Sequence, residues 1–417
     1  MLRILVLTNM YPPHHYGGYE LACRDVVERW RRRGHEVTVL TTTMRLRGVQ
    51  DPLDEGGVQR ELDFYFRDGD LYAHPTWKRP LLERANQRVL RRAIEDVRPD
   101  VVSVWHMGAM SFSLLATLAE RGLPLVYVVC DDWLSYGPNL DGWMRMFQPA
   151  GRIPRLIGDL VERVWRVPTQ LPDVGRSGAF CFASRSTQDR SEAAGRWAFP
   201  DASVVPLGVD LTDFPNPTEP PGARPWRWRL LVVGRLDQRK GVETAVRAMA
   251  HLPKEASLEI IGRGDAAYRA RLEAAAAAVG GGGRVTFSVC DRTELSARYQ
   301  AADVLLFPVE WEEPFGIVPL EGMASGTPVV ATGLGGSAEF LVDGENALLF
   351  RPGDHEDLAA AVRRLAAEPS LRAGLVDRGL RTAAGLTADR LADTLETRHV
   401  EAARRSVPGL DRSGSSA

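Results

Sequence analysis

The chain has 417 residues, of which 44% are hydrophobic and 25% charged, and its formal net charge is −2 at pH 7. This length and composition predict two globular domains, each with its own core. The near-neutral charge argues against a nucleic-acid-binding protein, and no apolar run approaches the ~20 residues of a membrane-spanning helix. Four scattered cysteines argue against a disulfide framework or paired metal ligands.

The first half is expected to fold as a parallel α/β domain. Residues 3–8 are too short for a signal peptide and are predicted to form the first strand. A glycine loop, a helix at 19–33 and a strand at 36–41 complete a βαβ unit. Further strands are predicted at 100–105, 124–129, 179–183 and 203–205. The pattern indicates a doubly wound, Rossmann-like domain over 1–210.

The glycine loop of this unit contains the adjacent pair Gly17 and Gly18. Paired glycines let the backbone approach a ligand closely, and N–H groups at the start of the following helix can hold phosphate oxygens. Taken alone, the pair is equally consistent with a simple tight turn.

An amphipathic helix is predicted within residues 143–166. Apolar side chains recur there at i, i+4 spacing between arginines. We expect its apolar face to pack on the first domain. The alternative is contact with a lipid, which the near-neutral charge of this half does not favour.

A proline-rich segment, residues 211–228, is predicted to link the domains. A second Rossmann-like series follows over 229–385, with a first strand at 229–233 and a helix at 241–250. Later strands are predicted at 257–261, 284–288, 303–307 and 328–331. Two such domains favour a ligand in the cleft between them.

The chain is expected to end with an amphipathic helix at 386–404 and a polar, disordered tail at 405–417.

Two motifs in the second half carry charge that could serve chemistry. Arg235 and Lys240 follow the first strand and could neutralise a diphosphate, although a solvated charged loop is the simpler alternative. Lys240 is one of only three lysines, against 49 arginines, a bias that suggests a GC-rich genome. The second motif places Glu313 and Glu321 on either side of a Phe-Gly step. Free N–H groups at the start of the expected helix and two carboxylates suit a sugar or a ribose.

These motifs resemble those of the retaining glycosyltransferases of family 4, also called group 1, which have two Rossmann-like domains facing a cleft (the GT-B fold). The family's Glu-x7-Glu signature matches Glu313 to Glu321, and its Gly-Arg-Leu-x3-Lys-Gly motif matches Gly234 to Gly241. Weaker matches across the chain are Val205-Pro-Leu-Gly-Val-Asp210, with Leu207 where Asn is usual, Ile261-Gly-Arg-Gly-Asp265, and Gly335-Gly-Ser-Ala-Glu339. The resemblance implies that the last helix crosses back onto the first domain.

The resemblance implies transfer of a sugar, with retention, from a nucleoside diphosphate sugar to a hydroxyl of a glycan, lipid-linked or small-molecule acceptor. It places Glu313 and the N–H groups of residues 315–317 on the sugar, and Glu321 on the ribose. The implied donor-binding residues are Gly17, Gly18, Arg235, Lys240, Gly262, Glu313, Phe315, Gly316, Ile317 and Glu321. No cofactor or metal ion is required, and UDP- or GDP-sugars are the expected donors on family frequency.

The acceptor side departs from the family pattern. Relatives carry His after the strand equivalent to 124–129, where this chain has Cys130 and Asp131. Cys130 has no positioned base and is not expected to act as a nucleophile. Asp131 either takes the polar role or caps the next helix. His106 ends a neighbouring strand and is the second catalytic candidate; His14 and His15 are further candidates for acceptor contact.

Two other functions share this architecture. A sugar-nucleotide 2-epimerase is expected to lack the Glu-x7-Glu signature, and a non-catalytic sugar-nucleotide-binding protein is hard to reconcile with intact diphosphate and glutamate motifs. We expect a cytoplasmic bacterial enzyme. Weak peripheral contact with a membrane would place it at the inner membrane face. No nucleic-acid partner is expected, and the sequence does not indicate an oligomeric state.

Overall fold

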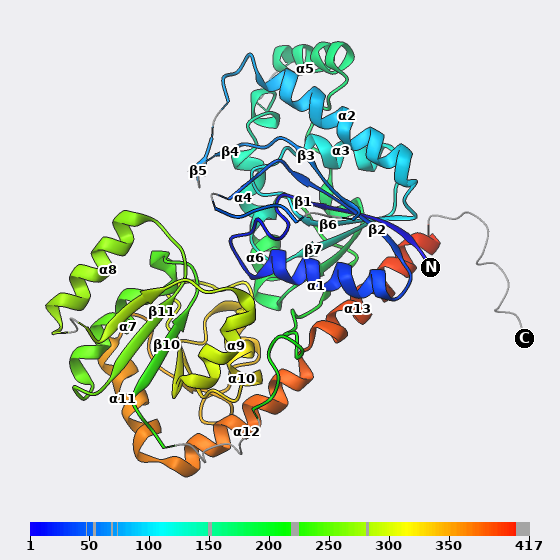
Figure 1. The fold of residues 1–417 in the computed structure, drawn as a ribbon. Helices are drawn as coiled ribbons and strands as arrows, with labels where there is room; N and C mark the ends of the chain where they lie inside the picture. The colour runs from blue at the N-terminus through cyan, green and yellow to red at the C-terminus, as the bar shows by residue number, and fades with distance from the viewer. Residues whose placement is uncertain are drawn as a thin grey trace, which may run out of the picture. The chain divides into compact units, whose positions relative to one another are not determined.

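The structure is a computed structural model that describes residues 1–46, 48–52, 56–67, 70–72, 74–148, 152–217, 225–280 and 283–405. The chain divides into two compact units (Figure 1). The first unit contains residues 1–15 and 19–205 together with the chain from Ala392 onward, and the second contains 16–18 and 206–391. Part of the predicted linker and the predicted tail beyond Arg405 lie outside the described residues.

The first unit is built on a seven-stranded sheet with the order β3-β2-β1-β6-β7-β8-β9. Its strands all pair in parallel. They are β1 (Arg3–Thr8), β2 (Glu36–Thr42), β3 (Val58–Leu62), β6 (Val101–His106), β7 (Leu125–Val129), β8 (Ala179–Phe182) and β9 (Ala202–Val204). Every residue of β6, β7 and β8 is buried, as expected for parallel strands covered by helices on both faces.

The covering helices of this unit are α1 (Gly18–Arg32), α2 (Arg79–Val97), α3 (Ser113–Glu120), α4 (Trp133–Leu140), α5 (Arg152–Trp165) and α6 (Arg185–Ala193). Two 3-10 turns, Met144–Met146 and Val174–Arg176, and a short antiparallel pair, β4 (Phe66–Arg67) with β5 (Asp70–Leu71), complete the unit. Figure 1 shows α1 on one face of the sheet and α2 and α3 on the other. The predicted strands of this half are confirmed to within one residue at each end, whereas β3 was not predicted.

The second unit contains a six-stranded parallel sheet with the order β12-β11-β10-β13-β14-β15. The strands are β10 (Arg229–Val233), β11 (Ser257–Ile261), β12 (Val285–Ser288), β13 (Val304–Phe307), β14 (Val329–Ala331) and β15 (Leu348–Leu349). The helices are α7 (Val242–Ala248), α8 (Ala266–Ala278), α9 (Arg292–Ala301), α10 (Ile317–Ala324), α11 (His355–Ala367) and α12 (Pro369–Gly385). Both units are therefore Rossmann-like, as predicted. The loops after β10 and β13 open at the same edge of the sheet, because the two strands are parallel neighbours.

One packing expectation is confirmed only in part. The helix predicted within residues 143–166 forms as α5, and Trp143 and Met144 before it are fully buried. However, Leu156, Leu160 and other apolar residues of α5 remain exposed instead of packing on the first unit. None of the described helices is both long and apolar enough to span a membrane.

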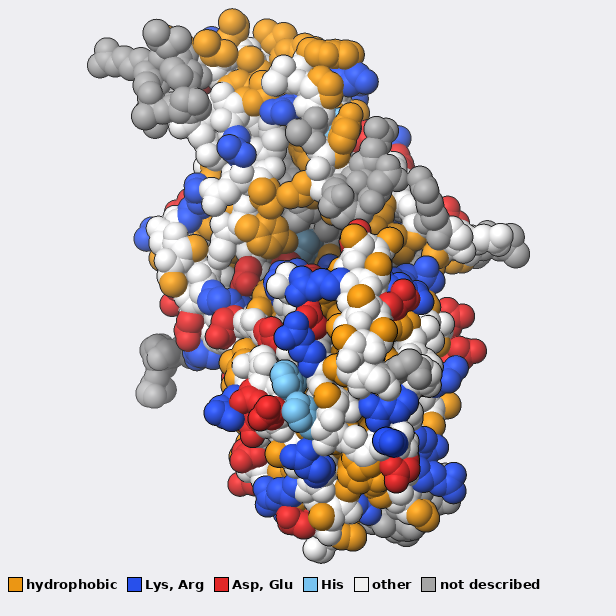
Figure 2. Space-filling model, turned by 90° about the vertical axis from the view of Figure 1, so that its left-hand side faces the viewer, with side chains coloured by type: hydrophobic (Ala, Val, Ile, Leu, Met, Phe, Trp, Pro, Cys, Tyr) orange, Lys and Arg blue, Asp and Glu red, His pale blue; other side chains and the backbone are white. Residues whose placement is uncertain are grey.

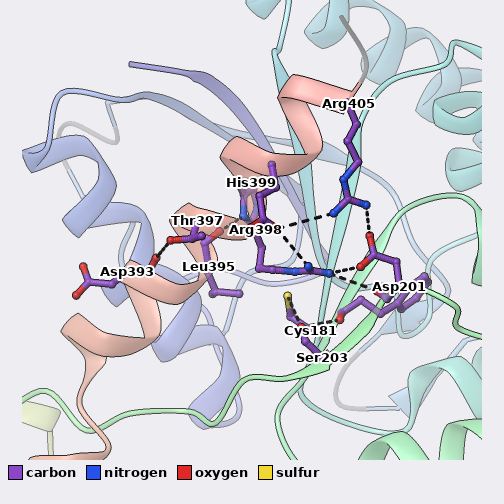
Figure 3. A network of polar contacts seen from close by, with 11 residues as sticks. Cys181, Asp201, Ser203, Asp393, Leu395, Thr397, Arg398, His399 and Arg405 are labelled. Atoms are coloured by element: carbon purple, nitrogen blue, oxygen red, sulfur yellow. Dashed lines mark hydrogen bonds and ion pairs between the residues drawn. The ribbon is translucent and has the colours of Figure 1, made fainter. Parts of the chain in front are cut away.

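The last helix, α13 (Ala388–Arg405), joins the first unit from Ala392 onward. The indole N–H of Trp30 on α1 donates to the Ala392 carbonyl at 3.2 Å. Two guanidinium groups, from Arg398 and Arg405, bind the Asp201 carboxylate just before β9, each at 2.5 Å (Figure 3). The helix α13 is thus held on the first unit at two places, α1 and the edge of the sheet.

His399 is the fully buried polar residue of this contact. Its ring meets Trp30 edge-on, with centroids 4.7 Å apart, and its Nδ1 is 2.6 Å from the Leu395 carbonyl oxygen. The other ring nitrogen, Nε2, has no hydrogen-bond partner among the described residues. Burial lowers the pKa of His399 from 6.5 to about 4, although the Leu395 carbonyl opposes this shift.

The stability of the first unit should therefore decrease as the pH is lowered from about 6.5 to about 4, the unfolded and folded pKa values of His399. Below pH 6.5 the unfolded chain binds a proton that folded His399 takes up only near pH 4, so acid favours unfolding by up to ~2 kcal/mol at about pH 5. His399→Leu should lose less stability between about pH 7 and pH 5 than the wild type in denaturant titrations. His355→Leu, in the second unit, is the control. Equal pH dependence in wild type and His399→Leu would contradict the assignment.

Candidate functional site

The centre of the second unit's candidate site is an ion pair between Lys240 and Glu313. The Lys240 ammonium nitrogen lies 2.6 Å from Oε2 of Glu313. The indole N–H of Trp311 donates to the same oxygen at 2.7 Å. Glu313 is only 9% exposed, and the Lys240 side chain keeps 21% of its surface. A buried carboxylate is thus held by two donors, one of which remains accessible to a ligand.

Close backbone approaches hold together the loops after β10, β13 and β14 around this pair. Gly241 follows Lys240 with φ +61°, and a Cβ there would lie 1.8 Å from the Pro308 carbonyl oxygen. Gly335 has φ +62°, and its Cβ would lie 2.4 Å from the Glu313 carbonyl oxygen, which also accepts the Gly336 N–H at 2.6 Å. Only glycine fits such positions without a backbone shift. The Gly335-Gly336 pair therefore supports the backbone of Glu313.

The cations beside Lys240 are held by a neighbouring carboxylate. Arg239 binds Asp237 at 2.7 Å and lies 4.5 Å from the centroid of the Trp311 ring. Hydrogen bonds from Arg239 lower the pKa of Asp237 to about 2. Arg235 is exposed and lies 3.6 Å from the same carboxylate. Arg235 therefore contacts Asp237, whereas Lys240 contacts Glu313.

The second carboxylate of the motif lies inside α10, the helix that begins at Ile317 after Gly316 in a left-handed conformation. Glu321 is 5% exposed and accepts the Tyr299 hydroxyl at 2.8 Å. Arg292 approaches its other oxygen to 3.9 Å. Burial and the Glu321 charge raise the pKa of Tyr299 well above its ordinary value, so Tyr299 remains a hydrogen-bond donor to Glu321.

Two other residues predicted to bind the sugar donor, Phe315 and Gly262, lie in tightly packed parts of these loops. Phe315 is buried and its ring packs against that of Phe340. A Cβ at Gly262 would lie 1.8 Å from the Gly234 carbonyl oxygen, so glycine is needed where the loop after β11 meets the loop that carries Arg235.

In the first unit, His106 and Asp131 form a second polar centre at the ends of β6 and β7. Nε2 of His106 lies 2.7 Å from Oδ2 of Asp131, and the Tyr136 hydroxyl donates to the same oxygen at 3.0 Å. Oδ1 of Asp131 accepts the N–H of Trp133 at 3.0 Å. Asp131 therefore bonds His106 and also accepts the first backbone N–H of α4, as the capping alternative predicts. Its acceptor-side role stays a prediction.

The tautomer of His106 follows from its second nitrogen. The Gly108 N–H points at Nδ1 at 3.1 Å, so Nδ1 accepts and Nε2 carries the hydrogen that Asp131 accepts. The Tyr19 ring stacks on the imidazole with centroids 4.5 Å apart. Burial alone would raise the pKa of Asp131, but His106 and the hydrogen bonds from Trp133 and Tyr136 hold it below its ordinary value. Asp131 is thus an anion, and its side chain keeps 24% of its surface.

The other candidates of the first unit lie elsewhere. Cys130 is buried, and burial together with the Asp131 charge raises the pKa of its thiol, which agrees with the expectation that it is no nucleophile. Both ring nitrogens of His14 are in hydrogen bonds, to Asp51 at 2.7 Å and from the Leu46 N–H at 3.1 Å. The acceptor contact of His15 stays a prediction. Gly17 and Gly18 lie where β1 leads into α1, in the segment 16–18 that belongs to the second unit.

Three aromatic residues that support these centres were not singled out from the sequence: Trp311, Tyr136 and Tyr299. Trp311 precedes Glu313 by two residues, so its position beside the motif was the available signal. Tyr136 lies on α4, five residues after Asp131, and Tyr299 comes from α9, which carries none of the motifs. Among the described residues, no group of three or more His, Cys, Asp or Glu side chains is arranged to hold a metal ion.

Comparison with protein families finds two matches that together cover most of the chain. Residues 16–213 match the family model described as "Glycosyltransferase Family 4", and residues 219–381 match that of "Glycosyl transferases group 1". The phosphatidyl-myo-inositol mannosyltransferase of Mycolicibacterium smegmatis is 34% identical over 87% of this chain and 84% of its own length. The glycogen synthase of Mycobacterium tuberculosis is 27% identical over 88% and 87%.

Solved structures share the fold. The sucrose-phosphate synthase of Thermosynechococcus elongatus superposes with a TM-score of 0.69, at 21% identity, over 95% of this chain and 98% of that one. The Anabaena protein HepE in complex with UDP and glucose gives a TM-score of 0.67 at 20% identity, over 95% and 99%. At these identities the likeness shows the fold alone, which is the predicted arrangement of two Rossmann-like units.

Removing the Tyr299 hydroxyl should destabilise the second unit. Tyr299→Phe removes a hydroxyl that donates a hydrogen bond to the buried Glu321 carboxylate, so we expect a loss of ~1–3 kcal/mol in the free energy of unfolding. Tyr268→Phe is the matched control, because the Tyr268 hydroxyl is buried without a hydrogen-bond partner among the described residues. Denaturant titration should show little change for Tyr268→Phe. A similar loss in both variants would show that the Tyr299–Glu321 bond contributes nothing specific.

Proposed function

Since the chain belongs to the group 1 glycosyltransferases of family 4, we propose that it transfers a sugar, with retention of anomeric configuration, from a nucleoside diphosphate sugar to an acceptor hydroxyl. The observation that carries the donor assignment is the Lys240–Glu313 pair with its Trp311 support. It combines a cation for a diphosphate with a carboxylate for sugar hydroxyls. Both come from the ends of neighbouring parallel strands, where such sheets bind ligands.

The proposed donor contacts follow the chemistry of each group. Lys240 binds the diphosphate while Trp311 keeps Glu313 in place. Glu313 and the N–H groups at the start of α10 bind sugar hydroxyls. Glu321, oriented by Tyr299, accepts hydrogen bonds from the ribose. Arg235 is exposed and exchanges its contact with Asp237 for one with the diphosphate. The N–H groups beside Gly17 and Gly18 also bind the diphosphate.

The transfer step needs no nucleophile from the protein. The bond between the anomeric carbon and the leaving phosphate oxygen breaks, and the acceptor oxygen bonds to the same face of that carbon. The acceptor proton passes to the leaving phosphate oxygen. Lys240 and Arg235 neutralise the charge that develops on the diphosphate. In this proposal these two cations act without a metal ion.

On the acceptor side we assign the direct contact to Asp131 and a positioning role to His106. Both nitrogens of His106 are engaged, by Gly108 and Asp131, whereas the Asp131 carboxylate is anionic and partly exposed. Asp131 can accept a hydrogen bond from the acceptor hydroxyl and orient it. His106 fixes the carboxylate and keeps it ionised.

We propose that the donor is a UDP-sugar or a GDP-sugar. The HepE structure contains UDP and glucose, and the relatives named above are a mannosyltransferase and a glycogen synthase. These relatives are named for different products. The donor of this chain should therefore be identified by a thermal-shift screen against nucleoside diphosphate sugars. A ligand at 100 times its Kd adds about 2.7 kcal/mol of stability.

With the donor identified, Lys240→Ala should lower kcat by about 100- to 1000-fold, because removing one charge-stabilising donor commonly costs ~3–4 kcal/mol in the barrier. Arg235→Ala should lower kcat in the same direction. Lys254→Ala, an exposed lysine of the same unit, is the control and should behave as wild type. A folded Lys240→Ala variant with near-normal kcat would contradict the proposal that Lys240 binds the diphosphate.

Asp131→Asn should lower kcat while leaving binding of the nucleoside diphosphate unchanged in calorimetry. Asparagine keeps a carbonyl oxygen for the Trp133 N–H, so the start of α4 is preserved. Asp132→Asn, which breaks the 3.0 Å pair with Arg190, is the neighbouring control.

The same assignment predicts a change in pH profile for His106→Phe. Removing the imidazole removes a cause that lowers the pKa of Asp131, so the acid limb of kcat/KM should move to higher pH. An unshifted limb, or unchanged kcat in Asp131→Asn, would remove Asp131 from the acceptor site.

A further inference from the structure

The helix α5 presents an apolar stripe to solvent. The stripe consists of Leu156, Ile157, Leu160 and Val164, whose side chains are 67%, 52%, 63% and 60% exposed. The side of the helix next to this stripe packs on the first unit through Val161 and Trp165. Figure 2 shows hydrophobic side chains gathered at the top of the molecule, the height at which Figure 1 places α5. A contiguous exposed apolar surface of this kind marks an interaction site.

A second exposed apolar pair lies at the start of the neighbouring helix α2. Trp77 and Leu81 are 67% and 54% exposed. The two helices are in contact, since the Arg84 guanidinium lies 5.8 Å from the centroid of the Trp165 ring. Exposed tryptophan beside aliphatic residues is typical of side chains at a membrane–water interface.

The same part of α2 carries positive charge. Lys78, Arg84 and Arg88 are exposed, and the single acid between residues 75 and 94, Glu83, is fully buried. The whole chain has a net charge of −2, so this basic surface is a local feature. Positive charge beside an apolar stripe is complementary to anionic lipid headgroups above an acyl layer.

We propose that this face, formed by the α5 stripe and the start of α2, docks on the surface of an anionic bilayer. The apolar residues of α5 enter the boundary between headgroups and acyl chains, and the cations of α2 contact the headgroups. A second copy of the chain is a poorer occupant, because a symmetric contact would bring the same cations face to face. Docking needs neither donor nor acceptor, so it stands or falls separately from sugar transfer.

The full chain should co-sediment with vesicles of phosphatidylcholine and phosphatidylglycerol, and less with phosphatidylcholine alone. The variant Leu156→Glu/Leu160→Glu should lose binding to both. The variant Lys78→Glu/Arg88→Glu should lose roughly tenfold or more in affinity for the anionic vesicles. Added salt should weaken the anionic preference, because it screens exposed charges.

The controls are surface changes of the same kind in the second unit. Val342→Glu replaces an exposed aliphatic residue, and Lys254→Glu reverses an exposed lysine; both should bind as wild type. Melting curves establish that each variant is folded. Absence of vesicle binding by the wild type, or wild-type binding by the Leu156→Glu/Leu160→Glu variant, overturns the proposal. So does a lower oligomeric state in that variant, since the stripe would then be covered by a second copy.

Discussion

The close approach of the loops after β10 and β13 is the constraint on which the second unit's site depends. Gly241 removes the side chain that would keep these loops apart, and Gly335, after β14, lets a third loop support the backbone of Glu313. Lys240 and Glu313 then meet at 2.6 Å with Trp311 as a second donor to the carboxylate. A charge pair partly removed from water is stabilising only when its remaining groups are satisfied, and here the indole supplies that bond. The site is thus shaped by backbone geometry before any ligand enters.

The first unit follows the same rule with different residues. His106 and Asp131 follow β6 and β7, which are also parallel neighbours, and Gly108 provides both an N–H for the imidazole and space beside it. A Cβ at Gly108 would lie 2.3 Å from Cε1 of His106. In each unit, then, a glycine in a loop that follows a strand allows the close approach beside one member of the pair. In each, an aromatic residue, Trp311 or Tyr136, supplies the additional hydrogen bond.

The strands and the residues after them could be predicted because buried parallel strands are continuous apolar runs bounded by glycines and polar residues. β3 was missed because Val58–Leu62 lies at the sheet edge and contains charged residues. The partner of Glu321 was not predictable, since Tyr299 comes from another helix. Periodicity likewise identified α5 as amphipathic but not which side of it faces solvent. The His106–Asp131 bond was not predicted either, although both residues were candidates, because sequence does not show that side chains from two strand ends meet.

The donor site is best tested by a crystal structure with the bound nucleoside diphosphate sugar. We expect a diphosphate oxygen within hydrogen-bond distance of the Lys240 ammonium group, and a sugar hydroxyl bound to Glu313 while Trp311 keeps its bond to that carboxylate. A donor bound elsewhere, with the Lys240–Glu313 pair unchanged and no contact to either residue, would contradict this assignment.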